Sequence, residues 1–285
     1  GKPSSSTSTV NVDLVGQLTP QTTPKRVRIS RRPRVSRYIP GNRFGRGTVA
    51  FSVNEPIVNE PIKIDVWSDI ACPWCYIGKR NLEAGLAAAA EDANAPAVEV
   101  VYHSYELSPD TPVDFDGSEI EFLAGHKGMQ ASQVQQMLEN VTGVAAQAGL
   151  EYNFDILKHT NTVKAHELLH FAKVQGVQRE VMERLMRAYF TEGRHVGRID
   201  DLVTLATEAG LDATATRDAL ESGRFTPDVR ADQAQAQAYG INGVPFFVID
   251  GKYGVSGAQP AEAFTQVVRQ VWEERGAADS VSEMA

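Results

Sequence analysis

Two cysteines three positions apart are the residues of this sequence best suited to chemistry. Cys72 and Cys75 are the only cysteines in the chain, and they enclose Pro73 and Trp74. On a helix this spacing places both sulfurs on one turn, within disulfide reach. The N-terminus of a helix stabilises a thiolate, so we expect a lowered pKa for Cys72 and a nucleophilic role. Cys75 is then placed to resolve the mixed disulfide that Cys72 forms.

Other roles for such a pair agree less well with the composition. A structural zinc site needs four ligands, usually from two such pairs, and the chain has no second pair. A structural disulfide at this spacing would close a very short loop and constrain the unfolded chain little. The sequence therefore favours redox chemistry, and we expect neither a cofactor nor a bound metal.

The segments around the motif predict a strand followed by a helix. Ile62, Ile64 and Val66 alternate with polar residues, as in a β-strand. Pro73 suits the first position of a helix, because a helix needs no N–H from that residue. Residues 98–107 predict a second strand. The result is a β-α-β unit with the redox motif at its first strand–helix junction.

The rest of the chain predicts a helical stretch and then a second group of strands. Apolar residues recur with a helical period over 130–148, 162–175, 178–191 and 200–209, and glycines follow these segments. A helix is predicted from Thr226 to Gly240. Strands are predicted over 246–249 and 252–255, joined by an Asp250-Gly251 turn. A helix over 260–275 closes the body, and the last residues are expected to be frayed.

Three motifs resemble one known family. Residues 68–80, 243–248 and 255–260 are similar to the FrnE-like branch of the DsbA superfamily. That branch is related to 2-hydroxychromene-2-carboxylate isomerases and kappa-class glutathione transferases. The resemblance covers about residues 61–275 and implies an α/β thioredoxin-like fold with an all-helical insertion. The expected parts are a first thioredoxin-like part at 61–107, the insertion at 108–225, a second part at 226–276 and a frayed tail at 277–285.

The resemblance also implies roles for residues around the cysteines. Pro245 is expected to be a cis-proline facing them, although an X–Pro bond taken by itself is usually trans. The backbone of Val244 is then open to an extended substrate, and Pro73 and Trp74 support the site. Contacts to the groove or to substrate are expected from Asn161, His166, Ser256, Gly257 and Gln259.

A second motif suggests different chemistry. The five residues from His166 to His170 match the His-Glu-x-x-His pattern of zinc proteases, with Glu167 as the base. Glu180 or Glu183 could supply a third ligand. FrnE-like proteins resemble this segment without needing the glutamate, so we interpret the match as a coincidence.

We therefore expect a thiol–disulfide oxidoreductase that exchanges disulfides with proteins or small thiols and depends on an unidentified redox partner. Two alternatives stay open. One is a glutathione-linked isomerase or transferase acting on a small aromatic substrate, although Ala258 and Gln259 depart from the Ser-Asp pattern of the glutathione-using relatives. The other is a non-catalytic binding or chaperone-like module.

Residues 1–60 differ from the rest of the chain in charge. They carry ten Lys or Arg and three Asp or Glu, a charge of +7, whereas the remainder carries −15. They show no sustained hydrophobic period, which predicts a basic, flexible arm. We expect no membrane span and no nucleic-acid partner. No secretory hydrophobic region is visible, which predicts a cytoplasmic protein, and the basic arm leaves organellar targeting open.

Overall fold

The strands of this protein form one sheet. The computed structural model describes residues 25–26 and 60–283, with side chains from 60 to 277. The described strands are β1 (Lys25–Arg26), β2 (Ile62–Ser68), β3 (Val98–Ser104), β4 (Phe246–Ile249) and β5 (Tyr253–Ser256), in the sheet order β1-β5-β4-β2-β3. β2 and β3 are parallel, whereas β4 is antiparallel to both β2 and β5. The predicted β-α-β and β-β-α halves are therefore joined in one mixed sheet.

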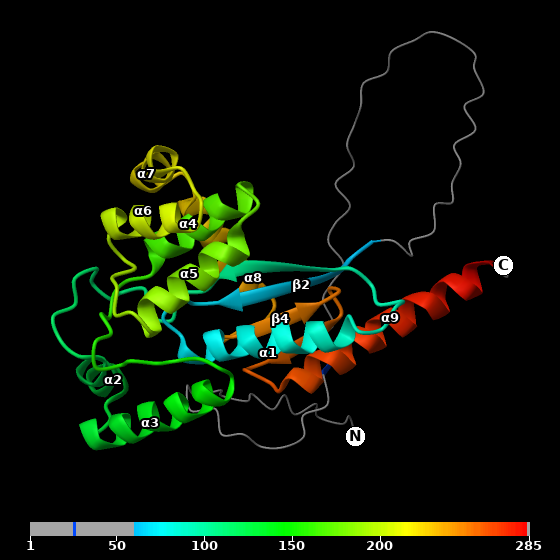
Figure 1. Ribbon diagram of the computed structural model, residues 1–285, viewed down its shortest axis with the longest axis horizontal. Helices are drawn as coiled ribbons and strands as arrows, with labels where there is room; N and C mark the ends of the chain where they lie inside the picture. The colour runs from blue at the N-terminus through cyan, green and yellow to red at the C-terminus, as the bar shows by residue number, and fades with distance from the viewer. Residues whose placement is uncertain (1–24, 27–59, 284–285) are drawn as a thin grey trace, which may run out of the picture.

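Helices surround this sheet (Figure 1). They are α1 (Pro73–Ala89), α2 (Glu119–Lys127), α3 (Ala131–Gln147), α4 (Val163–Val174), α5 (Gln178–Phe190), α6 (Ile199–Glu208), α7 (Ala213–Glu221), α8 (Thr226–Ala238) and α9 (Ala261–Glu283). Helices α2–α7, which we call the helical block, lie between β3 and α8 in the chain. Figure 1 shows them gathered around the end of the molecule where α1 begins. The α/β fold with an all-helical insertion is thus confirmed.

Different helices cover the two faces of the sheet because side chains alternate along each strand. Ile64 of β2 packs in the main apolar cluster with Leu82 of α1 and Phe264 of α9. Trp67 faces the other way and packs with Ala236 of α8 in a second cluster. Figure 1 shows α1 and α9 side by side along the sheet. The helix that carries the redox motif, α1, therefore packs on the sheet beside α9.

Glycines permit two tight features of this framework. The β4–β5 hairpin turns at Asp250 and Gly251, whose φ angles are 55° and 63°, as a two-residue turn of matching twist requires. On α1, a Cβ at Gly85 would lie 2.4 Å from the carbonyl oxygen of Ala261. The predicted hairpin turn is confirmed, and α1 and α9 approach so closely only because position 85 carries no side chain.

The helical periods of the sequence do not single out α2 and α7. Both helices have nine residues, which is too short for a period to stand out. Local signals do mark α2. The Ser118 hydroxyl accepts a bond from the N–H of Glu121, whose carboxylate accepts the Ser118 N–H in return. The helix ends at Gly128, which has a φ of 62°. This capping box and C-terminal glycine are legible in the sequence.

The last helix is longer than the sequence predicted. α9 continues to Glu283 instead of ending near Arg275, so residues 277–283 are helical where a frayed tail was expected. The segment contains alanines and no proline. Gly276 by itself costs a helix only about 1 kcal/mol relative to alanine, so it does not end α9.

Most of the predicted flexible arm, residues 1–60, lies outside the described residues. Lys25 and Arg26 are an exception, because they form β1 and pair with Gly254 and Tyr253 of β5. The sequence did not predict this strand. A segment of two residues is too short to show a periodic signal. The unpaired backbone groups of an edge strand can pair with a segment of almost any sequence.

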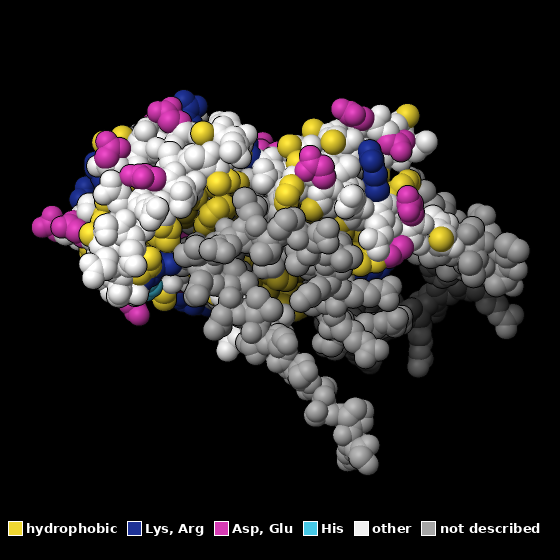
Figure 2. Space-filling view, turned by 90° about the horizontal axis from the view of Figure 1, so that it is seen from below, with side chains coloured by type: hydrophobic (Ala, Val, Ile, Leu, Met, Phe, Trp, Pro, Cys, Tyr) yellow, Lys and Arg dark blue, Asp and Glu magenta, His cyan; other side chains and the backbone are white. Residues whose placement is uncertain are grey.

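The surface carries the acidic charge that the sequence predicts for the body. Figure 2 shows Asp and Glu side chains spread over both ends of one face rather than gathered in a single patch. No helix in the described part of the chain combines the length and the apolar character that a bilayer crossing requires.

Candidate functional site

The two cysteines lie where β2 gives way to α1. Cys72 is the N-cap of α1 and Pro73 is its first residue, as predicted, so Cys75 falls on the first turn. The two side chains are not joined by a disulfide in the structure. Cys72 has no exposed surface and Cys75 is 2% exposed. The two cysteines are therefore equally buried.

The surroundings raise the pKa of one of these thiols. Burial, with a contribution from the neighbouring Cys72 thiol, raises the pKa of Cys75 well above its ordinary value. The backbone N–H of Asp69 favours the Cys75 thiolate and opposes this shift only in part. Cys75 therefore stays protonated to a higher pH than an ordinary cysteine does.

The loop of Val244 and Pro245 faces the first cysteine. The Val244–Pro245 peptide bond is cis. The Cys72 thiol points at the carbonyl oxygen of Val244, with 3.7 Å between sulfur and oxygen. A Cβ at Gly78 of α1 would lie 2.9 Å from Cγ of Pro245, so the redox helix and this loop are in direct contact. Residues 172 positions apart in the sequence therefore meet at the cysteine.

Ser256, Gly257 and Gln259 lie behind this loop. The N–H of Gly257 donates to the carbonyl of Pro245 at 2.9 Å. The side-chain amide of Gln259 donates to the carbonyl of Ser256 at 2.9 Å, and the backbone carbonyl of Gln259 accepts a bond from Asn81 of α1. These contacts hold the Pro245 loop in place, and substrate contact by these three residues stays a prediction.

The side chain of Asn161 is likewise hydrogen-bonded to backbone groups of the protein. Its side-chain amide donates to the carbonyls of Pro109 and Thr111, both at 2.9 Å. Its side-chain oxygen accepts the N–H of Val163 at the start of α4. Asn161 therefore ties the segment after β3 to the start of α4, and its contact with the groove stays a prediction.

The two histidines of the zinc-protease pattern bind different carboxylates. His166 lies 3.2 Å from Asp69, and His170 lies 3.0 Å from Asp232. Glu167 accepts bonds from Lys164 and Thr226. Within the described ranges, no three His, Cys, Asp or Glu side chains group as a metal site. The side chains of this motif therefore do not converge as a zinc protease requires.

Glu183, considered above as a third zinc ligand, serves α1 instead. Its carboxylate accepts bonds from Tyr76, Lys79 and Arg80 of that helix. Burial by itself raises the pKa of Glu183, but Arg80 and Lys79 outweigh this effect and lower it to about 2. Lys79 is only 4% exposed and pairs with Glu183. These charged groups form an ion-pair cluster that joins α1 to α5.

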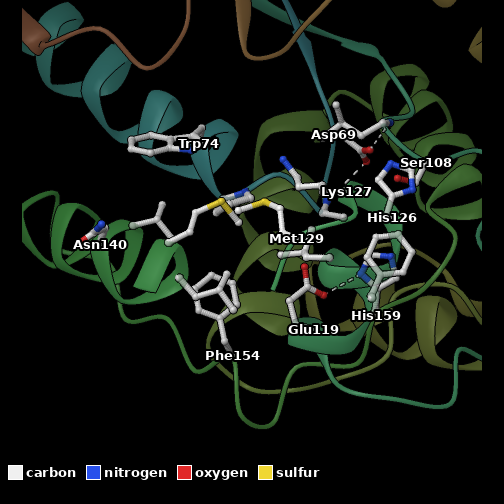
Figure 3. Close-up of a pocket in the computed structure, with 18 of the residues that line it drawn as sticks. Asp69, Trp74, Ser108, Glu119, His126, Lys127, Met129, Asn140, Phe154 and His159 are labelled. Atoms are coloured by element: carbon white, nitrogen blue, oxygen red, sulfur yellow. Dashed lines mark hydrogen bonds and ion pairs between the residues drawn. The ribbon is translucent and has the colours of Figure 1, made fainter. Parts of the chain in front are cut away.

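A cavity of about 570 Å³ opens beside the redox motif (Figure 3). Ala71, Pro73 and Trp74 line it on the side of α1, so Cys72 lies between two of its lining residues. Trp74 and Asn140 stand at one end of the cavity in Figure 3, and Ser108 stands at the other. A molecule in this cavity would lie directly against the chain around Cys72.

The far wall of the cavity comes from the helical block and was missed by sequence reasoning. Its apolar part is formed by Phe122, Leu123, Met129, Met137, Val141 and Phe154. Its polar part includes Glu119 and His159, which are hydrogen-bonded at 2.8 Å. The capping box of α2 could have revealed the helix. No local signal could have shown that the helix closes over the cysteines.

Tyr152 is a further supporting residue without a sequence signal. Its hydroxyl donates to the carbonyl of Pro73 at 2.6 Å, across 79 positions of the sequence. Its ring stacks on Tyr76 of α1 and on Phe190 of α5. The N-terminal turn of the redox helix is thus anchored to the helical block.

Comparison with known proteins agrees with this architecture. The model of the DsbA-like thioredoxin domain matches residues 63–269. The uncharacterised protein YwbO of Bacillus subtilis (strain 168) is 33% identical over 211 residues, which cover 73% of this chain and 96% of that protein. A probable DsbA oxidoreductase of Streptomyces coelicolor has a similar structure, with a TM-score of 0.69, 42% identity, and coverage of 75% of this chain and 91% of that one.

A more distant structure shares the fold. The cytosolic disulfide reductase DsbM of Pseudomonas aeruginosa, solved with GSH, has a TM-score of 0.52 and 20% identity, over 73% of this chain and 98% of that one. The family model spans most of this chain. The B. subtilis relative aligns with this chain along nearly the whole length of the relative. This chain therefore belongs to the DsbA-like thioredoxin domain family.

Proposed function

We propose that this chain is a thiol–disulfide oxidoreductase that exchanges disulfides with proteins or small thiols through Cys72 and Cys75. One observation carries the proposal: two cysteines lie at the N-terminal turn of α1, and the first of them faces the Val244 carbonyl. Membership of the DsbA-like family and the similarity to a probable DsbA oxidoreductase support it.

The reaction needs only the two thiols and the substrate disulfide. The Cys72 thiolate attacks one substrate sulfur, the substrate S–S bond breaks, and the other substrate sulfur leaves and takes up a proton. Cys75 then loses its proton and attacks the Cys72 sulfur. The mixed disulfide breaks, and the second substrate thiol is released with a proton. Two electrons pass from the protein thiols to the substrate, and the reverse sequence oxidises a substrate dithiol.

The cavity beside Cys72 is the proposed place for the substrate group next to the reacting sulfur. Its lining is mainly apolar, with Phe122, Met137 and Phe154 across from Trp74. An apolar side chain of a protein substrate, or the body of a small thiol, would be removed from water there. The Val244 backbone at the other side of Cys72 would orient an extended substrate chain.

Insulin reduction with dithiothreitol tests the proposal. The wild-type chain should accelerate precipitation of the insulin B chain, and Cys72→Ser should abolish this activity. Cys75→Ser should accumulate mixed disulfides on Cys72, because the resolving thiol is gone. Wild-type activity in the Cys72→Ser chain would contradict the proposal.

The same variants separate the two alternatives. A glutathione-linked isomerase or transferase does not need a second thiol, so Cys75→Ser would retain such an activity. A binding module would bind its ligand equally well with either serine. Loss of exchange in both variants, with trapping only in Cys75→Ser, is the pattern expected of the oxidoreductase.

A further inference from the structure

A buried carboxylate shapes the loop that carries Cys72. Asp69 is 2% exposed, and its backbone carbonyl accepts the N–H of Cys72 at 3.2 Å. This bond closes a turn, so the two Cα atoms are within about 7 Å of each other. The carboxylate also accepts the N–H of Ala71 at 3.5 Å and that of Leu107 at 2.9 Å. Asp69 is thus fixed next to the redox pair and away from water.

The helical block supplies a partner for this carboxylate. His166 of α4 has no exposed surface, and its Nε2 lies 3.2 Å from Oδ1 of Asp69. Nδ1 of His166 is buried without a hydrogen-bond partner among the described residues. The Nε2 side of the ring therefore faces the carboxylate, and His166 is the group of the helical block that contacts Asp69.

These bonds keep Asp69 ionised. Burial by itself raises the pKa of Asp69. The hydrogen bond and the electrostatic attraction of His166, with hydrogen bonds from Leu107 and Thr162, outweigh burial and hold the pKa below its usual range. A carboxylate ion in a dry site repels a second negative charge nearby. A negative charge formed on the cysteine pair would lie near this carboxylate.

Resting on the proposed function, we propose that the buried carboxylate of Asp69, which contacts His166, biases the cysteine pair toward donating electrons to substrates. A pair whose thiolate is disfavoured has a less stable reduced form and so is a weaker oxidant. Asp69 and His166 are positioning residues, because they act through the charge beside the sulfurs and do not themselves exchange disulfides.

Other ionisable groups near the pair do not supply this charge. They are Tyr102 of β3, Tyr152 before α4, Tyr189 of α5, Glu119 of α2 and Arg80 further along α1. Burial raises the pKa of all three phenols, so they are uncharged at neutral pH. Arg80 is paired with Glu183, and Glu119 is paired with His159.

The experiment compares Asp69→Asn, His166→Phe and the double variant in the full chain. The readouts are the equilibrium of Cys72 and Cys75 with reduced and oxidised glutathione, and the ultraviolet absorbance of the thiolate as a function of pH. Asp69→Asn should move the equilibrium toward the reduced protein by about tenfold, or about 30 mV, and should raise the thiolate fraction at a given pH. His166→Phe should shift both readouts in the same direction. The double variant should equal Asp69→Asn, because His166 acts through Asp69.

His170→Phe is the matched control. His170 lies one turn further along α4, is also buried, and also hydrogen-bonds a carboxylate, that of Asp232. The His170→Phe protein should be less stable than wild type, but its equilibrium with glutathione should be unchanged. If His166→Phe does not fold, Asp69→Asn against His170→Phe still decides the question.

Three outcomes would overturn the inference. They are an unchanged or lower potential in Asp69→Asn, a shift in His170→Phe as large as that in His166→Phe, and additive shifts in the double variant. A wild-type chain that exchanges no disulfide with glutathione, dithiothreitol or insulin would instead contradict the proposed function.

Discussion

At the scale of single residues, the two thiols are equally buried but differ in what surrounds them. Burial and the Cys72 thiol raise the pKa of Cys75. Cys72 caps α1, where the helix N-terminus favours negative charge. We expect iodoacetamide to label Cys72 well before Cys75 at mildly acidic pH. Peptide mapping by mass spectrometry would check this, and faster labelling of Cys75 would reverse the assigned roles.

Gly78 decides how closely the redox helix approaches the Pro245 loop. A Cβ at this position would lie 2.9 Å from Cγ of Pro245 and 3.3 Å from Cζ of Phe247. Gly78→Ala should therefore push the helix and the loop apart, destabilise the protein by about 1–3 kcal/mol and slow insulin reduction. Urea unfolding and turnover measure the two effects.

Gly143→Ala provides the control for the Gly78 substitution. Gly143 also lies within a helix, and a Cβ there would meet nothing within 4 Å. Alanine should stabilise α3 by up to about 1 kcal/mol and leave turnover unchanged. Equal effects of the two substitutions would show that contact with the Pro245 loop is not the cause.

At the scale of elements, α1 is held to α5 by the carboxylate of Glu183. Because its pKa falls from 4.5 to about 2 on folding, the ionised group contributes stability that is present above pH 4.5 and lost as the pH falls toward 2. Glu183→Gln should cost about 1–2 kcal/mol at pH 7, and this difference from wild type should shrink across that acidic range. Urea unfolding of both chains at several pH values measures it.

Glu180→Gln is the matched control on the same helix. Glu180 is exposed, and the substitution should leave the unfolding free energy near the wild-type value at every pH. A pH-independent loss in Glu183→Gln would show that its charge is not what joins the two helices.

β2, β3 and α8 meet at one histidine. The two ring nitrogens of His103 lie 2.7 Å from carboxylate oxygens of Asp232 and Asp65. Burial by itself lowers the pKa of His103, but the two carboxylates outweigh it and raise the pKa above 6.5. The protonated ring therefore contributes stability that is complete below pH 6.5 and is lost as the pH rises through the raised value.

Replacement of this histidine should remove that pH dependence. His103→Gln should be less stable than wild type at pH 6, and the difference should narrow at alkaline pH. Guanidinium unfolding at both pH values measures this difference. A difference that widens as the pH rises would contradict the charged pairing of His103 with the two carboxylates.

At the scale of the whole molecule, we expect the basic arm to be dispensable for disulfide exchange. The family match begins at residue 63, after the arm. Deletion of residues 1–55 removes β1, which contributes two residue pairs at the sheet edge. We expect insulin reduction and the glutathione equilibrium to stay within error of the full chain, at low and at high salt. A large fall in either would show that the arm takes part in exchange.

The sequence by itself determined the elements whose signals are local. The cysteine spacing with Pro73 placed the motif at the start of α1. The alternating residues of β2 and the Asp250-Gly251 turn predicted the strands and the hairpin. These features depend on backbone preferences and side-chain periods within a few residues, so one chain is enough to show them.

Only the tertiary structure decided which distant groups surround the cysteines. Asp69 precedes Cys72 by three residues, but its partner His166 is 97 positions away, on a helix whose sequence suggested zinc. Tyr152 reaches Pro73 across 79 positions, and the cavity wall comes from α2 and α3. Such contacts depend on how whole helices pack on the sheet, and packing leaves no period or spacing in the sequence.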